Sequence, residues 1–399
     1  MLKKLKDNVS FILILVLSIL IPLTFHPRFI DIGTAANVGR GGILYPFIIA
    51  DFLALFVLNV GKFEWIRNKD IRVIIISLLV TSVLSTTLIF IDNNSLFGEI
   101  RSIAICLFAM IIGWQINLSK GQFLTLFLLF GITVLYVGYL QIFIRGNGLE
   151  IGQYFADQKN ALGPLVATVG ILSFYFSSEK NISSFLKIIC IVILIIAFVI
   201  ILTIRARAAL LTLTLLVIVL ILKRFQNKRN IFISIMVVII LFAFAFVVLP
   251  DTVKQYIYDS IFYGTDDGDI TSGRADRNLD ALNIIIANPL FGNIYHQYKI
   301  DLVHNYFLII LVNYGLFFGL PLIVLYLYLF FKNIRKTIII KQLDISDIGF
   351  FVILIPFIVS LFEYTFPYGP GTATVMNFIF YGMTLKNRSP SYNQAGHSL

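Results

Sequence analysis

The feature that most limits the fold of this chain is a series of long apolar runs that follow one another along nearly all of its 399 residues. A helix that crosses a bilayer needs roughly 20 predominantly apolar residues. The alternating segments of about ten residues that a membrane β-barrel requires are not visible. We therefore predict an all-α polytopic membrane protein with about twelve transmembrane helices. The predicted spans are 9–25, 42–60, 71–91, 100–117, 122–144, 161–177, 186–204, 207–222, 231–249, 306–330, 347–364 and 369–385.

Composition supports the membrane class. Hydrophobic residues make up 59% of the chain and charged residues 13%, about half the roughly 25% that is usual in globular proteins. The net charge of +10 could indicate a nucleic-acid partner, but the cations cluster in short connections between apolar runs, where they set membrane orientation. Nucleic-acid binding is therefore not expected. Cys106 and Cys190 lie inside apolar runs and are expected to be buried small hydrophobes.

The positions of lysine and arginine predict that both termini are cytoplasmic. Under this orientation successive connections alternate in charge, and 20 of the 31 cations face the cytoplasm, as the positive-inside rule requires. The first run resembles a signal peptide, but no small-residue cleavage site follows it, so we expect a retained anchor. The cytoplasmic cations are Lys3, Lys4, Lys6, Lys62, Arg67, Lys69, Arg72, Lys120, Lys180, Lys187, Lys223, Arg224, Lys228, Arg229, Lys332, Arg335, Lys336, Lys341, Lys386 and Arg388.

The same orientation divides the chain into four parts and places one long loop outside. Loops longer than about 12–15 residues are usually functional or disordered, and the apolar residues of this loop favour a folded segment. The predicted parts are helices one to nine over 1–250, the outer loop over 251–303, helices ten to twelve over 304–385 and a cytoplasmic polar tail over 386–399.

Within the outer loop, residues 272–289 predict an amphipathic helix that stops at Pro289. Leu279, Leu282 and Ile286 would share its apolar face. Arg274 and Arg277 are three residues apart and would share another face.

Two arginines stand in the middle of an apolar stretch that runs from 185 to 222. Arg205 and Arg207 would each cost about 2.5–3.5 kcal/mol at the centre of a bilayer, so the topology places them at the outer ends of two adjoining helices. One explanation is that they only reach toward outer-leaflet phosphates. Because the guanidinium fork matches phosphate oxygens bidentately, we favour a phosphate-bearing ligand at the outer surface.

A second polar pair, His304 and Asn305, lies where the outer loop re-enters the membrane. A neutral histidine can accept a proton or donate a hydrogen bond, although interfacial anchoring would also explain the pair. His26 and His296 are also predicted outside and compete for this role, whereas His397 lies in the polar tail.

Two acidic features receive less weight. The sequence DDGD at 266–269 contains the Asp-x-Asp of metal-dependent nucleotide-sugar enzymes. It is predicted outside, where nucleotide sugars are absent, so no metal site is expected. Asp51 is an intramembrane acid without an obvious basic partner. We expect it to form a buried helix-to-helix hydrogen bond rather than to couple proton movement.

The ordered motifs resemble the bacterial O-antigen ligase and polymerase superfamily. They are FADQKNALGPL at 155–165, IRARAALLTL at 204–213, SGRADRNLDALNIIIANPLFGN at 272–293 and HNYFLIILVNYGLFFGLPLIVL at 304–325. Ala206 stands where the family usually has serine, so Arg207 takes the family's arginine position and Arg205 is an extra charge. Leu279 replaces a common aromatic residue, and Asn293-Ile294 follow Gly292 where a second glycine is usual.

The resemblance implies a glycosyltransferase that acts without a metal or cofactor at the outer face of the bacterial cytoplasmic membrane. Its donor would be a glycan on undecaprenyl pyrophosphate, and its acceptor a sugar hydroxyl. Arg205 and Arg207, with Arg274, would stabilise charge on the leaving pyrophosphate, and His304 would orient or deprotonate the hydroxyl. Further candidates for substrate binding are Asn160, which takes the family's asparagine place, Arg277 and Asn305.

Three functions remain open at this point. A polymerase would join lipid-linked repeat units into O-antigen or capsular polysaccharide, in the company of membrane lipids, a flippase and a chain-length regulator. A ligase would move the finished glycan to lipid A core or another acceptor. We favour the polymerase because no feature of the chain indicates a lipid A core acceptor. A lipid-linked-oligosaccharide flippase would place its charges in a central cavity, rather than at one surface beside a long loop.

Overall fold

The computed structural model describes residues 2–27, 44–59, 63–88, 95–142, 156–179, 181–204, 206–224, 273–294, 303–340, 344–369 and 371–386, together with a few positions between 236 and 255. Within these ranges every regular element is a helix. The prediction of an all-α chain is confirmed for this part of the sequence.

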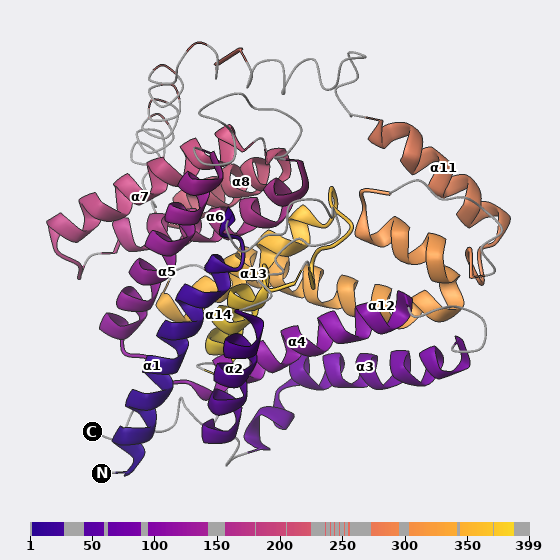
Figure 1. The fold of residues 1–399 in the computed structure, drawn as a ribbon, viewed down its shortest axis with the longest axis horizontal. Helices are drawn as coiled ribbons and strands as arrows, with labels where there is room; N and C mark the ends of the chain where they lie inside the picture. The colour runs from indigo at the N-terminus through magenta and orange to yellow at the C-terminus, as the bar shows by residue number, and fades with distance from the viewer. Residues whose placement is uncertain are drawn as a thin grey trace.

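The first half of the chain forms a series of long helices, most of which follow one another after short connections (Figure 1). Each is built from a run of apolar residues, and polar residues stand at most of the ends. The helices are α1 (Leu2–Leu23), α2 (Tyr45–Asn59), α3 (Lys69–Leu88), α4 (Ser95–Gln115), α5 (Lys120–Leu140), α6 (Ala156–Ser177), α7 (Ser184–Thr203) and α8 (Arg207–Arg224), with the short 3₁₀ helix η2 (Phe63–Arg67) before α3.

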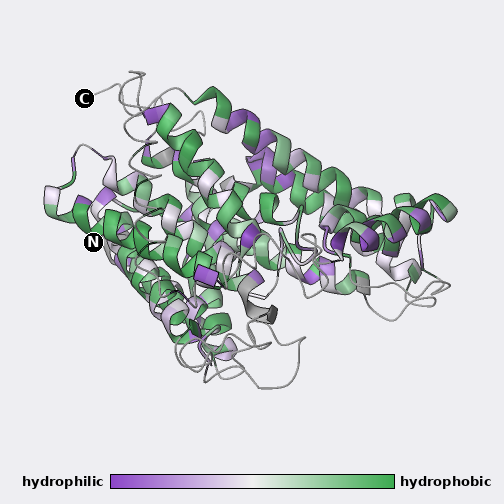
Figure 2. Ribbon diagram, turned by 90° about the horizontal axis from the view of Figure 1, so that it is seen from above, coloured by the Kyte–Doolittle hydropathy of each residue, from purple (hydrophilic) through white to green (hydrophobic). Residues whose placement is uncertain are grey.

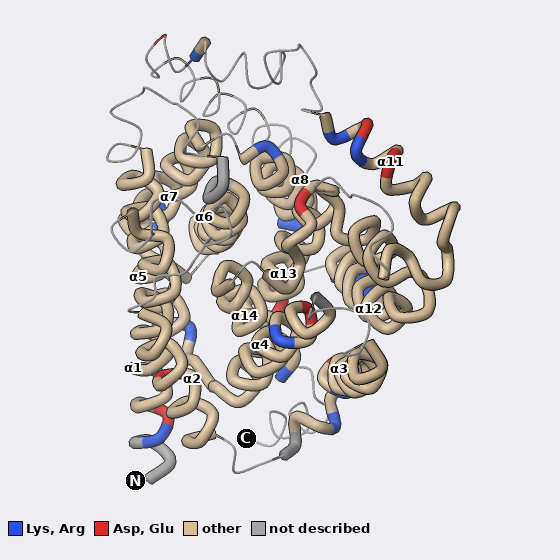
Figure 3. The backbone as a smooth tube through the Cα atoms, turned by 45° about the vertical axis from the view of Figure 1, so that its right-hand side comes forward, with Lys and Arg blue, Asp and Glu red and all other residues tan. Residues whose placement is uncertain are grey.

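The described residues of the second half form one peripheral helix, one very long helix and two short central ones. They are α11 (Arg274–Ala287), α12 (Tyr306–Ile339), α13 (Ile348–Val359) and α14 (Val375–Lys386), with the 3₁₀ helix η5 (Ile345–Asp347) before α13. The helix α11 lies at the edge of the molecule beside α12 (Figures 1 and 3).

Seven of the described helices are long and apolar enough to cross a membrane, which is the pattern of a polytopic membrane protein. Large apolar side chains such as Leu79, Val83 and Phe185 are exposed on their outer faces, and most of the ribbon is hydrophobic (Figure 2). The seven segments are Lys6–Leu23, Lys69–Leu88, Leu96–Gln115, Lys120–Leu140, Asn160–Ser177, Ser184–Thr203 and Tyr306–Ile339.

Three predicted spans form helices shorter than expected. The helix α2 has 15 residues, and α13 and α14 have 12 each. Twelve residues extend only about 18 Å, less than the hydrocarbon thickness of about 30 Å. Nearly all side chains of α13 and α14 are buried among other helices, so these two are core helices of the bundle. The predicted span 231–249 lies almost wholly outside the described residues.

The close contact between α4 and α14 depends on two glycines. A Cβ atom at Gly113 would lie 2.0 Å from the carbonyl oxygen of Ile379, and one at Gly382 would lie 2.0 Å from that of Met110. The backbones of the two helices therefore touch, as small residues allow in membrane proteins. Cys106, also on α4, is buried and free, as is Cys190 on α7, which confirms the prediction for both cysteines.

Replacing Gly113 with alanine is expected to lower the free energy of unfolding by about 1–3 kcal/mol or more, because the backbone of α14 has to move away. Gly98→Ala is the matched control on the same helix, since a Cβ there meets nothing within 4 Å. It should leave stability unchanged or raise it by up to about 1 kcal/mol through helix propensity. Thermal unfolding of the purified variants in detergent measures both, and equal melting temperatures would contradict the proposed contact.

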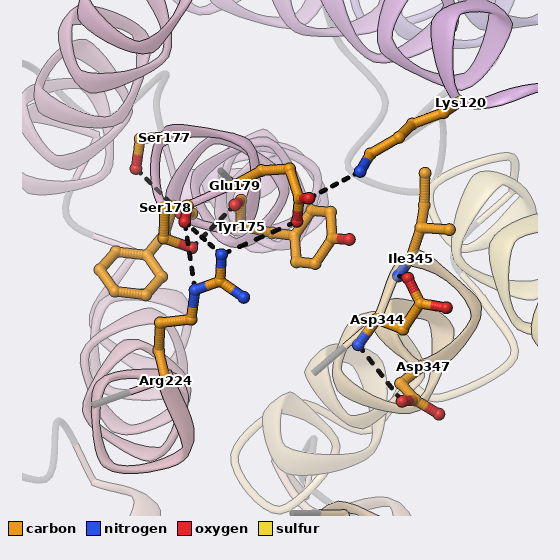
Figure 4. Close-up of polar contacts among 10 residues, drawn as sticks. Lys120, Tyr175, Ser177, Ser178, Glu179, Arg224, Asp344, Ile345 and Asp347 are labelled. Atoms are coloured by element: carbon orange, nitrogen blue, oxygen red, sulfur yellow. Dashed lines mark hydrogen bonds and ion pairs between the residues drawn. The ribbon is translucent and has the colours of Figure 1, made fainter. Parts of the chain in front are cut away.

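A buried acid ties together the ends of three helices (Figure 4). Glu179, just after α6, accepts a 2.6 Å hydrogen bond from Lys120 Nζ and lies 3.9 Å from Arg224 Nη2. Arg224 Nε also donates to the carbonyl oxygen of Ser178 at 3.1 Å. Burial disfavours the charged form of Glu179, but the hydrogen bond and charge of Lys120 and the charge of Arg224 outweigh it and lower the pKa. The start of α5 and the ends of α6 and α8 are thereby held at one end of the bundle.

The long helix α12 is interrupted at Gly315, where φ is 61° and ψ is −168°. This break separates a short helix from a second part long enough to span the membrane, and it frees backbone groups from helical hydrogen bonds. The turn that follows α11 supplies their partners, as a non-helical backbone inside a membrane protein requires. The bonds are Leu316 N to Pro289 O at 2.9 Å, Phe317 N to Leu290 O at 2.9 Å and Asn293 N to Val312 O at 2.7 Å.

Two glycines make this contact between the turn and α12 possible. Gly292 has a φ of 60°, and a Cβ there would lie 2.6 Å from the backbone nitrogen of Gly315. A Cβ at Gly315 would lie 2.4 Å from the carbonyl oxygen of Leu290. Both positions also have the positive φ that favours glycine. We call this contact between residues 289–293 and the break in α12 the glycine clasp.

Candidate functional site

A buried carboxylate, two arginines and a histidine from three separate segments meet beside the start of α12. Glu363, in the turn after α13, has a side chain only 6% exposed and accepts a 2.8 Å hydrogen bond from Arg274 Nη2. The second carboxylate oxygen of Glu363 lies 3.5 Å from His304 Nδ1. Arg277 Nη1 lies 3.1 Å from His304 Nε2. Arg274, Glu363, His304 and Arg277 thus form a continuous chain, which we call the Glu363 cluster.

The first turn of α11 positions the two arginines. Gly273 precedes the helix with a φ of 73°, and Arg274 and Arg277 follow three residues apart on one face. Arg277 reaches His304 before α12, and Arg274 reaches Glu363 in the turn after α13. The two arginines share one face of α11, as the sequence predicted for residues with this spacing. Arg274 Nη1 also donates to the carbonyl oxygen of Phe362 at 3.1 Å, so one guanidinium binds both the backbone and the side chain of the Glu363 turn.

The start of α12 fixes the histidine against the same turn. Asn305 is the N-cap of α12, and its side-chain oxygen accepts from the backbone nitrogen of Leu308 at 3.1 Å. Its amide donates to the carbonyl oxygen of Leu361 at 3.0 Å. The backbone nitrogen of Tyr306 donates to the carbonyl oxygen of Ser360 at 3.0 Å. His304 is therefore held between α11 and the Glu363 turn.

The contact with Arg277 determines the proton arrangement on His304. A guanidinium group can only donate, so Nε2 of His304 accepts. The proton of the neutral ring then lies on Nδ1, which faces Glu363. A carboxylate behind a histidine orients the ring and stabilises its protonated form. The basic nitrogen expected to accept a proton is occupied by Arg277, so His304 can act as a base only when Arg277 turns to another acceptor.

A second carboxylate, that of Glu99 on α4, is linked to the start of α12 next to this cluster. Tyr306 Oη donates to Glu99 Oε2 of α4 at 3.3 Å, and the Tyr306 ring stacks on Tyr326 with centroids 5.7 Å apart. Tyr326 Oη is 2.9 Å from the hydroxyl oxygen of Ser360. These contacts connect α4, α12 and the Glu363 turn through polar groups inside an otherwise apolar bundle.

Two other predicted residues lie on neighbouring helices. Arg207 is the first residue of α8, and its guanidinium lies close enough to that of Arg274 for the two charges to repel. Asn160 lies near the start of α6. A Cβ at Gly163, one turn further along, would lie 2.6 Å from that of Ala206, so the starts of α6 and α8 are in contact. Arg205 lies outside the described residues.

The structure therefore brings together His304, Asn305, Arg274 and Arg277, with Arg207 close by. His26 lies apart from these contacts, with its ring 6.3 Å from that of Tyr136 on α5. His296, His397 and the acidic stretch 266–269 fall outside the described residues. Among the residues that are described, no group of three or more His, Cys, Asp or Glu could hold a metal ion.

Leu279, Leu282 and Ile286 share one face of α11, as predicted, but this face does not pack against the bundle. Leu279, Leu282 and Ile286 are exposed by 59%, 42% and 75%, whereas Ala281 and Ile284 are buried against α12. The physical reason is the spacing of the arginines. Ala281 and Ile284 follow Arg277 at four and seven residues, so the face that brings the arginines to the Glu363 cluster also brings these two side chains against α12.

The expectation for Asp51 is also wrong. Its carboxylate is buried in α2, yet neither oxygen has a hydrogen-bond partner among the described residues. Glu99 and Glu363 were not predicted as site residues, although Glu363 is an acid inside a stretch, 348–385, that holds no other charged residue. That signal marks functional residues in membrane proteins by default.

Comparison with known proteins leaves this site to be interpreted from its own geometry. No protein-family model matches the chain, and no curated protein matches it. The motifs and the Glu363 cluster therefore carry the functional argument.

Proposed function

We propose that this protein is a membrane glycosyltransferase that polymerises oligosaccharide repeat units carried on undecaprenyl pyrophosphate. The observation that carries the proposal is the Glu363 cluster with Arg207 beside it. Three guanidinium groups and one carboxylate leave two positive charges around a neutral histidine. That excess suits a pyrophosphate, because arginine binds phosphate oxygens bidentately.

Backbone dipoles add to the attraction for an anion. The helices α8, α11 and α12 begin at Arg207, Arg274 and Tyr306, all within or next to the cluster. Each helix start carries a partial positive charge of about half an elementary charge, which attracts a nearby anion. The cluster and these helix starts together supply the electrostatic stabilisation that a departing pyrophosphate needs.

The geometry supports a sequence of proton and bond changes. Binding of the donor pyrophosphate would draw Arg277 away from His304 and free Nε2. The acceptor hydroxyl oxygen then attacks the anomeric carbon of the donor sugar, its proton passes to His304, and the bond from that carbon to the pyrophosphate oxygen breaks. Glu363 would stabilise the protonated histidine. The products are one longer lipid-linked glycan and free undecaprenyl pyrophosphate.

The decisive experiment is the reaction of purified protein with a lipid-linked repeat unit. We expect a ladder of longer lipid-linked glycans, with the same yield in the presence of a chelator, because arginine meets the charge of the leaving group. A glycan transferred only to a lipid A core acceptor would indicate a ligase instead. Glycan analysis of a deletion strain separates the three functions. Single repeats on the final acceptor indicate that a polymerase has been lost, and lipid-linked polymer that is not transferred indicates that a ligase has been lost. Repeat units that remain on the inner face of the membrane indicate that a flippase has been lost.

Replacing Arg207 with lysine is expected to reduce polymer formation by about 10²–10³-fold, the usual effect of losing one well-placed donor to a developing anion. Lysine keeps the charge but cannot form the bidentate contact. Arg224→Lys, at the other end of α8, is the matched control and should retain near wild-type activity. Polymer of wild-type length and yield from Arg207→Lys protein would remove arginine clamping of the pyrophosphate from the proposal.

A further inference from the structure

A groove between α3 and α12 lies at the other end of the bundle from the Glu363 cluster. Its volume is about 810 Å³. From Gly315 to Lys332, α12 rises about 25 Å along its axis, so the groove is well separated from the site described above. The helices α3 and α12 run side by side there (Figures 1 and 3). The lining residues are Lys69, Val324, Leu327, Tyr328, Phe331, Lys332, Arg335, Lys336 and Ile339.

One wall of the groove is fixed by a buried ion pair. Asp70 is 1% exposed and pairs with Lys332 Nζ. It also accepts hydrogen bonds from Tyr328 Oη at 2.8 Å and from Tyr381 Oη at 3.1 Å. These contacts give both carboxylate oxygens of Asp70 a partner, and the Asp70 carboxylate balances the charge of Lys332. The carboxylate therefore has little capacity left for the other cations of the groove.

Three further cations line the groove without a carboxylate partner. In the part of the chain that the structure describes, no ion pair joins Lys69, Arg335 or Lys336 to an acid. The charges of Lys69 and Lys336 also oppose that of Lys332. Like charges held this close favour an anion from outside the chain.

The remaining lining is apolar and faces outward. Val324, Phe331 and Ile339 are exposed by 53%, 60% and 57%, on a helix long and apolar enough to cross the membrane. Such surface gains nothing from a free phosphate ion, whereas the acyl chain of a lipid would cover it. The groove thus offers cations at one end and a hydrocarbon surface beside them.

We propose that this groove binds one anionic phospholipid. Its phosphate lies among Lys69, Arg335 and Lys336, and an acyl chain lies along Val324 and Phe331. The predicted topology puts this end of α12 at the cytoplasmic face, where clustered cations attract anionic lipid headgroups. The proposal does not depend on the glycosyltransferase activity.

The test is lipid binding to the full-length purified protein in detergent, measured by native mass spectrometry during titration with phosphatidylglycerol or phosphatidylcholine. The variant with Lys69→Gln, Arg335→Gln and Lys336→Gln is compared with one carrying Lys6→Gln, Arg67→Gln and Lys187→Gln, which loses the same charge outside the groove. We expect phosphatidylglycerol to bind the groove variant on the order of 100-fold more weakly than the control. Phosphatidylcholine should bind both variants equally weakly.

Two results would overturn the proposal. One is equal affinity of the two variants for phosphatidylglycerol. The other is displacement of phosphatidylglycerol by inorganic phosphate at a similar concentration, since the apolar wall would then contribute nothing. Both variants retain the Asp70–Lys332 pair, and their melting temperatures show whether a loss of binding reflects a loss of folding. If the groove variant is unfolded, Phe331→Ser alone must weaken phosphatidylglycerol binding for the proposal to stand.

Discussion

Glu363→Gln protein is expected to insert and fold but to form polymer about 10²–10³-fold more slowly than wild type, the scale of losing one preorganised electrostatic group. Glutamine has nearly the same shape and can still accept a hydrogen bond from Arg274. It removes the negative charge that faces His304 Nδ1 at 3.5 Å and would stabilise the protonated ring. The in vitro polymerisation rate at saturating donor measures the effect.

Glu179→Gln is the matched control for Glu363→Gln. Glu179 is also a largely buried acid that pairs with two cations, but it lies at the end of α6, away from the Glu363 cluster. This substitution should lower stability and leave the rate per folded molecule close to wild type. If both variants lose activity to the same extent, the effect of Glu363 is one of folding and the cluster is not a catalytic site.

His304→Ala is expected to lower the rate by about 10²–10⁴-fold, the range for losing a general acid or base. Alanine also removes the acceptor of Arg277, which leaves Arg277 free to bind phosphate. The affinity for the donor should therefore fall by a smaller factor than the reaction rate. Separate measurement of the rate at saturation and of the donor concentration at half-saturation tests this difference. His397→Ala should be silent. Loss of activity in His296→Ala, with His304→Ala active, would assign the base to His296.

The sequence predicted the helical class well because apolar run length is a local property. For example, the predicted span 122–144 is the helix α5, Lys120–Leu140. It predicted α13 and α14 less well. Both are predominantly apolar, and a buried core helix and a spanning helix look alike when only hydropathy is considered. Their 12 residues separate the two cases only once their ends are known.

The candidate site was predicted in part. Arg274 and Arg277 were predicted to share one face of α11, and His304 was a candidate site residue; all three lie in the Glu363 cluster. The place of Glu363 in the site could not be predicted from the sequence. It depends on a turn that brings Glu363 to His304 and Arg274, which are 59 and 89 residues away in the chain. The apolar face of α11 was misjudged for a related reason. An amphipathic pattern shows which residues share a face of a helix. It does not show which face packs against the bundle, because the neighbouring helices and the lipid are both apolar.

The glycine clasp has a consequence for how substrate can enter. It joins the turn after α11 to α12 by backbone hydrogen bonds, and Asn305 joins the start of α12 to the turn that carries Glu363. Arg274, Arg277 and His304 therefore lie on segments that are fastened to one another. In the proposed reaction, moving α11 outward to admit a lipid-linked sugar would break these backbone hydrogen bonds. We therefore expect α8, which carries Arg207, to be the part that moves when the donor binds.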